Sequence, residues 1–284
     1  MRRCYLIGYP VEHSMSALMQ NAAFEELGLG YHYELKAVRP EALGRFTADE
    51  MRGEAVRGAN VTIPYKVSIM RHLDEVDPEA AAIGAVNTIV NEGGGLNGYN
   101  TDGKGAMRAL EEAYGDLRGT KAVVIGAGGA ARAIGRHLST LVDELSILNR
   151  TASRAESLAS DLKSLPGCNA SVTPVALTRE NLKSRLVEAD VLINATPLGM
   201  TPDTDKSPVD SDLLHPGLLV FDTVYNPLKT RLLREAEEAG ARTLTGAKML
   251  AYQGAASFEL WTGVRAPEEL MFEVVVNALR RDRR

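Results

Sequence analysis

The sequence predicts an α/β protein with two domains: an N-terminal α/β domain completed by C-terminal helices, and a Rossmann-type doubly wound parallel sheet. Three observations lead to this fold class. From residue 121 to 246, short apolar runs rich in β-branched residues alternate with segments of helical periodicity. A glycine-rich turn separates the first of these runs from its helix. The two helical patterns after residue 246 complete no further βα unit.

The first hundred residues alternate strand and helix. Residues 16–27 have the pattern of a helix, and Gly28 is its stop signal. Asp102 is expected to cap a further helix that ends near Gly115. The expected strands cover residues 4–7, 31–35, 59–63, 85–90 and 96–99, with the last two joined through the glycines at 93–95.

The central part of the chain is expected to follow a strict order of strand and then helix, as in a parallel sheet covered on both faces. Two amphipathic helices, at 247–262 and 267–281, are expected to pack back on the first domain. The predicted domains are therefore residues 1–103 with 247–284, and residues 104–246. Strands of the second domain are expected near Val123, Ser146, Val172, Val191, Val220 and Thr243.

Composition indicates an ordinary globular protein. The 284 residues are 45% hydrophobic and 24% charged, which is enough for two substantial cores. A net charge of −5 does not favour nucleic acid or an anionic membrane as a partner. The basic tail of Arg280, Arg281, Arg283 and Arg284 is interpreted as the solvated end of a helix.

The cysteines and histidines indicate the redox compartment and whether a metal site is expected. Cys4 and Cys168 are far apart and match no metal or redox spacing, which fits a reducing cytoplasm. The five histidines show no ligand spacing, so no metal site is expected. No signal peptide or membrane-spanning run is found, and a cytoplasmic location is expected.

The segment from Lys121 to Leu138, KAVVIGAGGAARAIGRHL, has the strand, turn and helix of a dinucleotide-binding fingerprint. Gly126, Gly128 and Gly129 allow a sharp turn and a close approach of the backbone to a pyrophosphate at the helix start. Ala131 takes the third position of the fingerprint. A tight turn without a ligand is the alternative interpretation.

The next strand indicates which nucleotide binds. It ends in Asn149-Arg150-Thr151, with Arg154 one turn into the following helix. An NAD-binding chain normally has Asp or Glu at this strand end, where it accepts hydrogen bonds from the ribose hydroxyls. Two guanidinium groups and a hydroxyl suit a phosphate instead, so the sequence favours NADP over NAD. The alternative is that both arginines are ordinary surface residues.

Polar stretches interrupt the apolar patterns of the first domain. Ser14 and Ser16 stand at a helix start, where they can cap the helix or bind a carboxylate. His13 next to Ser14 does not make a serine nucleophile, because adjacent residues rarely face each other as base and attacker. Other polar side chains are expected at strand ends, where open α/β sheets bind ligands: Asn60, Thr62, Lys66, Asn87 and Asp102.

The motifs HSxS, GANVTxPxK, GAVNT, NTDG, GAGGA, NRT, NATPxGM and GxxMLxxQ run in this order from His13 to Gln253. Together they resemble the NADP-dependent shikimate dehydrogenase family. Ala17 and Gln20 depart from the family pattern, which commonly has Pro and His after the serines. The resemblance implies reversible, NADPH-dependent reduction of 3-dehydroshikimate to shikimate in the shikimate pathway.

The resemblance also implies roles for individual residues. Lys66 and Asp102 are the expected catalytic pair. The expected binders of the substrate carboxylate are Ser14, Ser16, Thr62 and Tyr225, the last from the other domain, and those of its ring hydroxyls are Asn60, Lys66, Asn87, Asp102 and Gln253. The expected cofactor-binding residues are Gly126, Gly128, Gly129, Ala130, Asn149, Arg150, Thr151, Arg154, Thr196, Pro197, Val224, Gly246 and Met249.

Elementary chemistry supports the catalytic pair independently. Hydride reduction of a ketone builds negative charge on oxygen, and a lysine ammonium stabilised by a carboxylate can donate the proton. A quinate or broad quinate/shikimate dehydrogenase is the alternative within the enzyme class. A catalytically silent NADP-responsive regulatory protein is the alternative outside it. A monomer or homodimer is expected.

Overall fold

The computed structural model describes residues 1–281, and the chain forms two compact units. The N-terminal unit contains residues 1–105 and the described residues from Leu250 onward, and the central unit contains residues 106–249. The boundaries fall within helices α4 (Asp102–Tyr114) and α9 (Gly246–Thr262). Residues 282–284, with Arg283 and Arg284 of the basic tail, lie outside the described part.

The N-terminal unit is built on a six-stranded mixed sheet with the order β2-β1-β3-β5-β6-β4. Strands β1, β2 and β3 are parallel, whereas β5 is antiparallel to both β3 and β6. The glycines at 93–95 join β5 and β6, as expected. The strands are β1 (Arg2–Gly8), β2 (Tyr31–Ala37), β3 (Val56–Val61), β4 (Glu75–Val76), β5 (Thr88–Glu92) and β6 (Gly95–Tyr99).

Two strand boundaries differ from the sequence expectation. The expected strand at 59–63 is β3, which ends at Val61, and the expected strand at 85–90 begins only at Thr88. Asn87 therefore lies in the connection before β5 and not within the strand. Helices α2 (Leu43–Asp49) and α3 (Pro78–Ile83) and the short strand β4 were not predicted.

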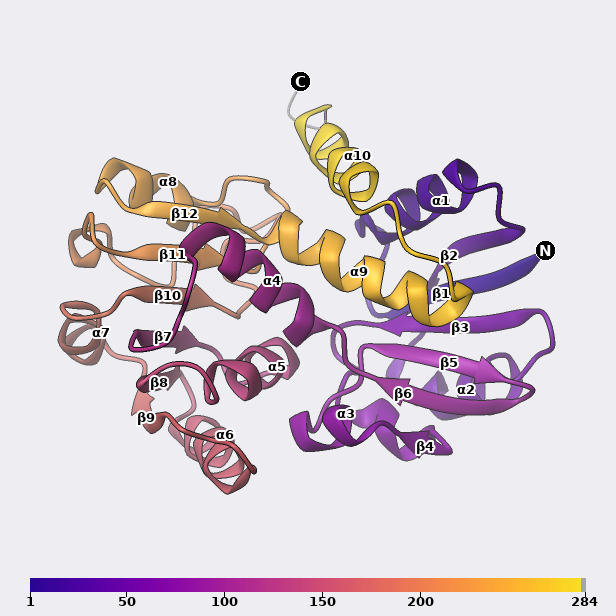
Figure 1. Ribbon diagram of the computed structural model, residues 1–284, viewed down its shortest axis with the longest axis horizontal. Coiled ribbons are helices and arrows are strands. Elements are labelled where there is room, and N and C mark those ends of the chain that lie inside the picture. The colour runs from indigo at the N-terminus through magenta and orange to yellow at the C-terminus, as the bar shows by residue number, and fades with distance from the viewer. Residues whose placement is uncertain (282–284) are drawn as a thin grey trace. The chain divides into compact units, whose positions relative to one another are not determined.

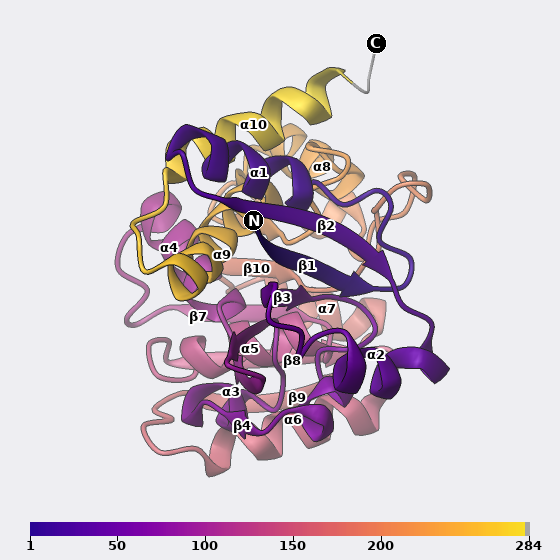
Figure 2. The same ribbon diagram turned by 90° about the vertical axis from the view of Figure 1, so that its right-hand side faces the viewer.

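Aromatic side chains join α1 to α9 and α9 to the N-terminal sheet. Phe24 of α1 (Ser16–Glu26) stacks on Phe258 of α9 with ring centroids 5.0 Å apart. Trp261, near the end of α9, donates its indole N–H to the backbone oxygen of Ile89 in β5. Helix α10 (Glu268–Arg281) packs against α1, as both views show (Figures 1 and 2). The part of α9 that follows Leu250 thus belongs to the core of this unit.

The central unit is a six-stranded, all-parallel sheet with the order β12-β11-β10-β7-β8-β9 (Figure 1). Read from β9, this is the 3-2-1-4-5-6 order of a Rossmann fold, which confirms the predicted fold class. The strands are β7 (Lys121–Ile125), β8 (Glu144–Asn149), β9 (Ser171–Ala176), β10 (Val191–Asn194), β11 (Leu219–Asp222) and β12 (Arg242–Thr245). The helices are α5 (Gly129–Leu138), α6 (Ala152–Ser164), α7 (Arg179–Leu186) and α8 (Arg231–Glu238).

One connection breaks the strict alternation expected for this unit. Between β10 and β11 the chain forms only a short 3₁₀ turn, Ser211–Leu213, and no α-helix. This segment contains Pro197, Pro202, Pro208 and Pro216, which remove backbone donors and fix φ. The expectation of a helix after every strand was therefore wrong at this point.

Candidate active site

Lys66 and Asp102 form a direct ion pair in the N-terminal unit. The Nζ of Lys66 donates to the Oδ2 of Asp102 at 2.5 Å, and their side chains are only 19% and 5% exposed. Lys66 lies in the turn after β3, and Tyr65 next to it is buried and donates its hydroxyl to the backbone oxygen of Val38. Because a buried neighbour anchors the turn, the ammonium is held beside its carboxylate.

The buried amide of Asn87 links the acidic partner to two neighbours. Its Nδ2 donates to Asp102 Oδ1 at 2.9 Å and to Gln253 Oε1 at 3.2 Å. Its Oδ1 accepts the backbone N–H of Thr101 at 2.8 Å. The structure thus brings together four of the predicted residues, Lys66, Asn87, Asp102 and Gln253.

Asn60 lies next to this group and is only 5% exposed. Its Oδ1 accepts from the hydroxyl of Tyr33 at 2.8 Å, and its Nδ2 donates to Ser257 Oγ at 2.9 Å. The Nδ2 also donates to the backbone oxygen of Asn87 at 3.2 Å. Most of its hydrogen-bonding capacity is therefore used within the protein.

The start of α4 differs from the sequence expectation. Asp102 is the first residue of the helix, and its carboxylate binds the side chains of Lys66 and Asn87. The Oδ1 of Asn100 accepts the backbone N–H of Asp102 at 3.1 Å. The capping function that was expected of Asp102 is thus supplied by Asn100.

The register of the strands places the polar residues at one end of the strands, where β1, β3 and β6 end and β5 begins. Val61 pairs with Ile7, Thr88 with Asn60, and Tyr99 with Thr88, so the ends of β1, β3 and β6 and the start of β5 lie together. Ser14 and Ser16 follow β1, Lys66 follows β3 and Asp102 follows β6. Thr62, which is also predicted to bind substrate, lies at the same end of the strands, directly after β3.

Ser14 and Ser16 share a hydrogen bond. Their hydroxyl oxygens are 3.2 Å apart, and the backbone N–H of Ser16 donates to Ser14 Oγ at 3.2 Å. Gln20, one of the two departures from the family pattern, is fully buried and donates its Nε2 to the backbone oxygen of Gly254 in α9. It therefore ties the helix that begins at Ser16 to the helix that carries Gln253.

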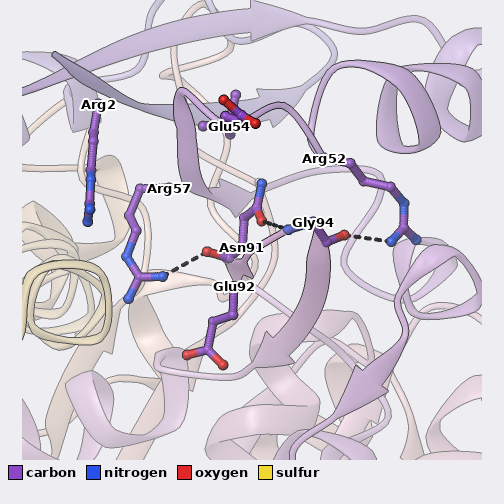
Figure 3. A pocket seen from close by; sticks show the side chains of 9 residues that line it. Arg2, Arg52, Glu54, Arg57, Asn91, Glu92 and Gly94 are labelled. Carbon is purple, nitrogen blue, oxygen red and sulfur yellow. Dashed lines mark hydrogen bonds between the residues drawn. The ribbon is translucent and has the colours of Figure 1, made fainter.

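A cavity of about 540 Å³ lies in the same unit at the opposite ends of these strands, near the starts of β1 and β3 and the end of β5 (Figure 3). Arg52 donates there to Asp74 and to the backbone oxygen of Gly94, and Arg57 donates to the backbone oxygens of Asn91 and Trp261. The arginines that line the cavity thus support the β5–β6 hairpin. None of the predicted site residues lines this cavity.

The glycine turn of the central unit has the geometry that a dinucleotide requires. Gly126 has a φ of +120°, and a Cβ there would lie 2.9 Å from the backbone oxygen of Ala195, so only glycine fits. At Gly128, no described atom lies within 4 Å of the position of a Cβ. Gly129 and Ala130 follow as the first residues of α5. The open space beside this helix start fits a pyrophosphate.

The end of β8 presents unpaired cations. Arg150 and Arg154 are exposed, and within residues 1–281 neither guanidinium group has a hydrogen bond or an ion pair. Asn149 donates its Nδ2 to the backbone oxygen of Thr151 at 2.9 Å, which shapes the turn between them. These groups fit the phosphate-bearing ribose of NADP better than a ribose with free hydroxyls.

Sequence reasoning missed two buried polar residues that end β10 and β11. Asn194 Oδ1 accepts from the hydroxyl of Thr196 at 2.6 Å, and Asp222 Oδ1 accepts the backbone N–H of Val224 at 3.0 Å. Asn194 and Asp222 are themselves hydrogen-bonded at 3.0 Å. The available signal was a single polar residue at the end of each apolar run, VLIN and LVFD. The pair shapes the loops that hold two of the predicted cofactor residues.

Burial raises the pKa of the Asp222 carboxyl to about 6, although hydrogen bonds from Thr230, Val224 and Asn194 favour the charged form.

The other residues of this unit that were predicted to bind substrate or cofactor also lie next to the ends of strands or helices. Pro197 follows Thr196, Tyr225 follows Val224, and Gly246 and Met249 lie in the first turn of α9.

Within residues 1–281, no three His, Cys, Asp or Glu side chains are grouped so that they could hold a metal ion. No helix in the same range has the length and apolar character needed to cross a membrane.

Comparison with protein families gives matches along most of the chain. A model of the shikimate dehydrogenase substrate binding domain matches residues 6–89. A model of shikimate / quinate 5-dehydrogenase matches residues 108–203, and a model of the shikimate 5'-dehydrogenase C-terminal domain matches residues 246–275.

Individual relatives agree with the family models. The NADP(+) shikimate dehydrogenase of Methanopyrus kandleri is 51% identical over 281 residues, which cover 97% of this chain and 95% of the relative. A crystal structure of shikimate dehydrogenase in complex with NADP+ has a TM-score of 0.90 at 42% identity, covering 98% of this chain and 96% of that one. The Thermus thermophilus enzyme in complex with NADP(H) and shikimate has a TM-score of 0.86 at 40% identity, covering 98% of this chain and 100% of that one.

Proposed function

The chain belongs to the shikimate dehydrogenase family, and we propose that it catalyses the reversible NADPH-dependent reduction of 3-dehydroshikimate to shikimate. This is an oxidoreductase reaction at a CH–OH group, in the shikimate pathway that leads to chorismate and the aromatic amino acids. The observation that carries the proposal is the 2.5 Å contact between Lys66 Nζ and Asp102 Oδ2 in a mostly buried setting.

The chemistry of this pair fits ketone reduction. NADPH supplies the hydride when bound, and the carbonyl oxygen of the substrate gains negative charge during the transfer. The Lys66 ammonium, stabilised by Asp102, donates a proton to that oxygen. In the reverse direction, the neutral amine of Lys66 accepts the proton of the alcohol. Asp102, held by Asn87 through its other oxygen, keeps the ammonium in place.

The proposed substrate-binding residues form two groups, one for the carboxylate of the substrate and one for its ring hydroxyls. The carboxylate is bound by Ser14, Ser16, Thr62 and Tyr225. The ring hydroxyls are bound by Asn60, Lys66, Asn87, Asp102 and Gln253. The buried hydrogen bonds of Asn60 to Tyr33 and Ser257 hold its side chain in place.

The central unit is proposed to bind NADP. The turn of Gly126, Gly128, Gly129 and Ala130 holds the pyrophosphate, and the end of β8 holds the phosphate-bearing ribose through Asn149, Arg150, Thr151 and Arg154. Thr196, Pro197, Val224, Gly246 and Met249 line the nicotinamide. The unpaired guanidinium groups of Arg150 and Arg154, among the described residues, support NADP over NAD.

The proposed setting is the cytoplasm, in keeping with two cysteines that form no disulfide. A monomer or homodimer, with no nucleic-acid or membrane partner, is proposed in keeping with the net charge of −5.

The test follows nicotinamide absorbance with purified protein. Shikimate and quinate are each offered with NADP and with NAD. The proposal expects the highest kcat/KM for shikimate with NADP. A higher kcat/KM for quinate supports the alternative dehydrogenase. No turnover with either substrate, combined with measurable NADP binding, supports the regulatory protein and contradicts the proposal.

A further inference from the structure

A cluster of buried hydroxyls lies behind the amide that holds Asp102. Thr88 and Ser257 are fully buried and Thr101 is 3% exposed. Thr88 begins β5, Thr101 precedes α4, and Ser257 lies on α9 one turn after Gln253. Their hydroxyl oxygens are within hydrogen-bond distance: Thr88 to Ser257 is 2.7 Å, and Thr101 to Ser257 is 3.2 Å.

The surroundings determine the orientation of the Asn87 amide. Its Oδ1 accepts the backbone N–H of Thr101, and its Nδ2 faces the carboxylate of Asp102. The reversed amide would place an NH₂ group against that N–H and an oxygen against the carboxylate. Both contacts would be repulsive, so only one orientation is compatible with the neighbours.

With the amide so oriented, the three hydroxyls form a connected hydrogen-bond network around it. Asn87 Nδ2 lies 2.9 Å from Thr101 Oγ1, and Thr88 donates to Asn87 Oδ1 at 2.9 Å. The Ser257 hydroxyl lies within hydrogen-bond distance of both threonine hydroxyls, and it donates to the backbone oxygen of Gln253 at 3.0 Å. Buried networks of this kind reinforce their own bonds in a low-dielectric interior.

We propose that Thr88 and Ser257 are positioning residues, which hold the Asn87 amide so that its NH₂ group faces the Asp102 carboxylate. They touch neither substrate nor cofactor. Their effect on the reaction is indirect, because the Asn87 amide orients the Asp102 carboxylate that pairs with Lys66. The kinetic part of this inference rests on the proposed function, whereas the orientation of the amide does not.

The test compares two substitutions of one residue. Thr88→Val keeps the shape and removes the hydroxyl, and Thr88→Ser keeps the hydroxyl and removes a methyl group. The matched control is Thr47→Val, because Thr47 is also buried in the N-terminal unit and its hydroxyl binds only the backbone oxygen of Leu43 among the described contacts. Misplacement of a catalytic group by a fraction of an ångström lowers kcat/KM by about tenfold to a hundredfold. We expect this loss in Thr88→Val, and less than about threefold in Thr88→Ser and Thr47→Val.

A second readout does not depend on activity. The backbone N–H of Thr101 donates to Asn87 Oδ1, so its hydrogen–deuterium exchange reports whether the amide is held. We expect faster exchange in Thr88→Val than in Thr88→Ser or Thr47→Val. Equal exchange in the three variants overturns the inference, even if the wild type shows no dehydrogenase activity. An active wild type whose Thr88→Val variant keeps normal kcat/KM also overturns it, and leaves the proposed function intact.

Discussion

A phosphate-binding arginine should discriminate between two cofactors that differ by one phosphate. Arg150 is exposed at the end of β8, where a carboxylate would exclude the 2′-phosphate. Charged hydrogen bonds of this kind contribute about 1.5–3 kcal/mol. Arg150→Ala is therefore expected to weaken NADP binding by about tenfold to a hundredfold, with little change for NAD.

Calorimetric titration of both cofactors measures this effect. Arg118→Ala is the control, because Arg118 is an exposed arginine of the same unit that pairs with Asp116. If Arg150→Ala weakens NADP and NAD equally, Arg150 does not bind the phosphate.

The residues of the candidate site could be predicted from the sequence where a motif places several polar groups at strand ends. Lys66, Asn87, Asp102 and Gln253 were all predicted, and they are joined by hydrogen bonds. The hydroxyls of Thr88 and Ser257 could not be assigned in this way. A buried serine in a helix has no local signature, because its partners come from β5 and the loop before α4 and depend on tertiary packing.

At the scale of elements, the end of β11 carries a buried carboxyl group. The pKa of Asp222 is raised by burial from 3.8 to about 6 in the folded protein. Between pH 4 and pH 6 the unfolded chain loses this proton while the folded protein keeps it, so Asp222 lowers stability as pH rises through this window. At about 1.4 kcal/mol per pKa unit, the loss reaches about 3 kcal/mol and stays constant above pH 6.

Asp222→Asn removes this titration and can keep all three hydrogen bonds. Its oxygen accepts from Val224 and Asn194 as before, and its new NH₂ donates to Thr230 Oγ1. Urea unfolding of both proteins from pH 4 to pH 7 should show the variant gaining stability relative to the wild type as pH rises. A difference between them that does not change with pH contradicts the assignment.

Elements were predictable where apolar periodicity is continuous. The parallel strands of the central unit were predicted from their β-branched runs, and the β5–β6 hairpin from its glycines. The segment between β10 and β11 has no apolar periodicity and four prolines, which explains why no α-helix forms there. The short helices α2 and α3 were missed because each has too few residues for a periodic pattern.

At the scale of the whole molecule, the chain divides its polar chemistry between two compact units. The acid–base pair and its hydrogen-bond network belong to the N-terminal unit, and the glycine turn, Arg150 and Arg154 belong to the central unit. Each unit by itself has the features of one half of a hydride-transfer reaction: a proton donor in one and a nucleotide site in the other. Reduction of a ketone by NADPH requires both features.

The rate of NADP reduction by shikimate in the Lys66→Ala variant tests the central claim most directly. Loss of the acid–base group should lower turnover by about 10²–10⁴-fold. NADP affinity should be unchanged, because Lys66 belongs to the N-terminal unit. Lys104→Ala is the control, since Lys104 is an exposed lysine of the same helix start as Asp102 and pairs with Glu79. Near-normal turnover in Lys66→Ala would contradict the account.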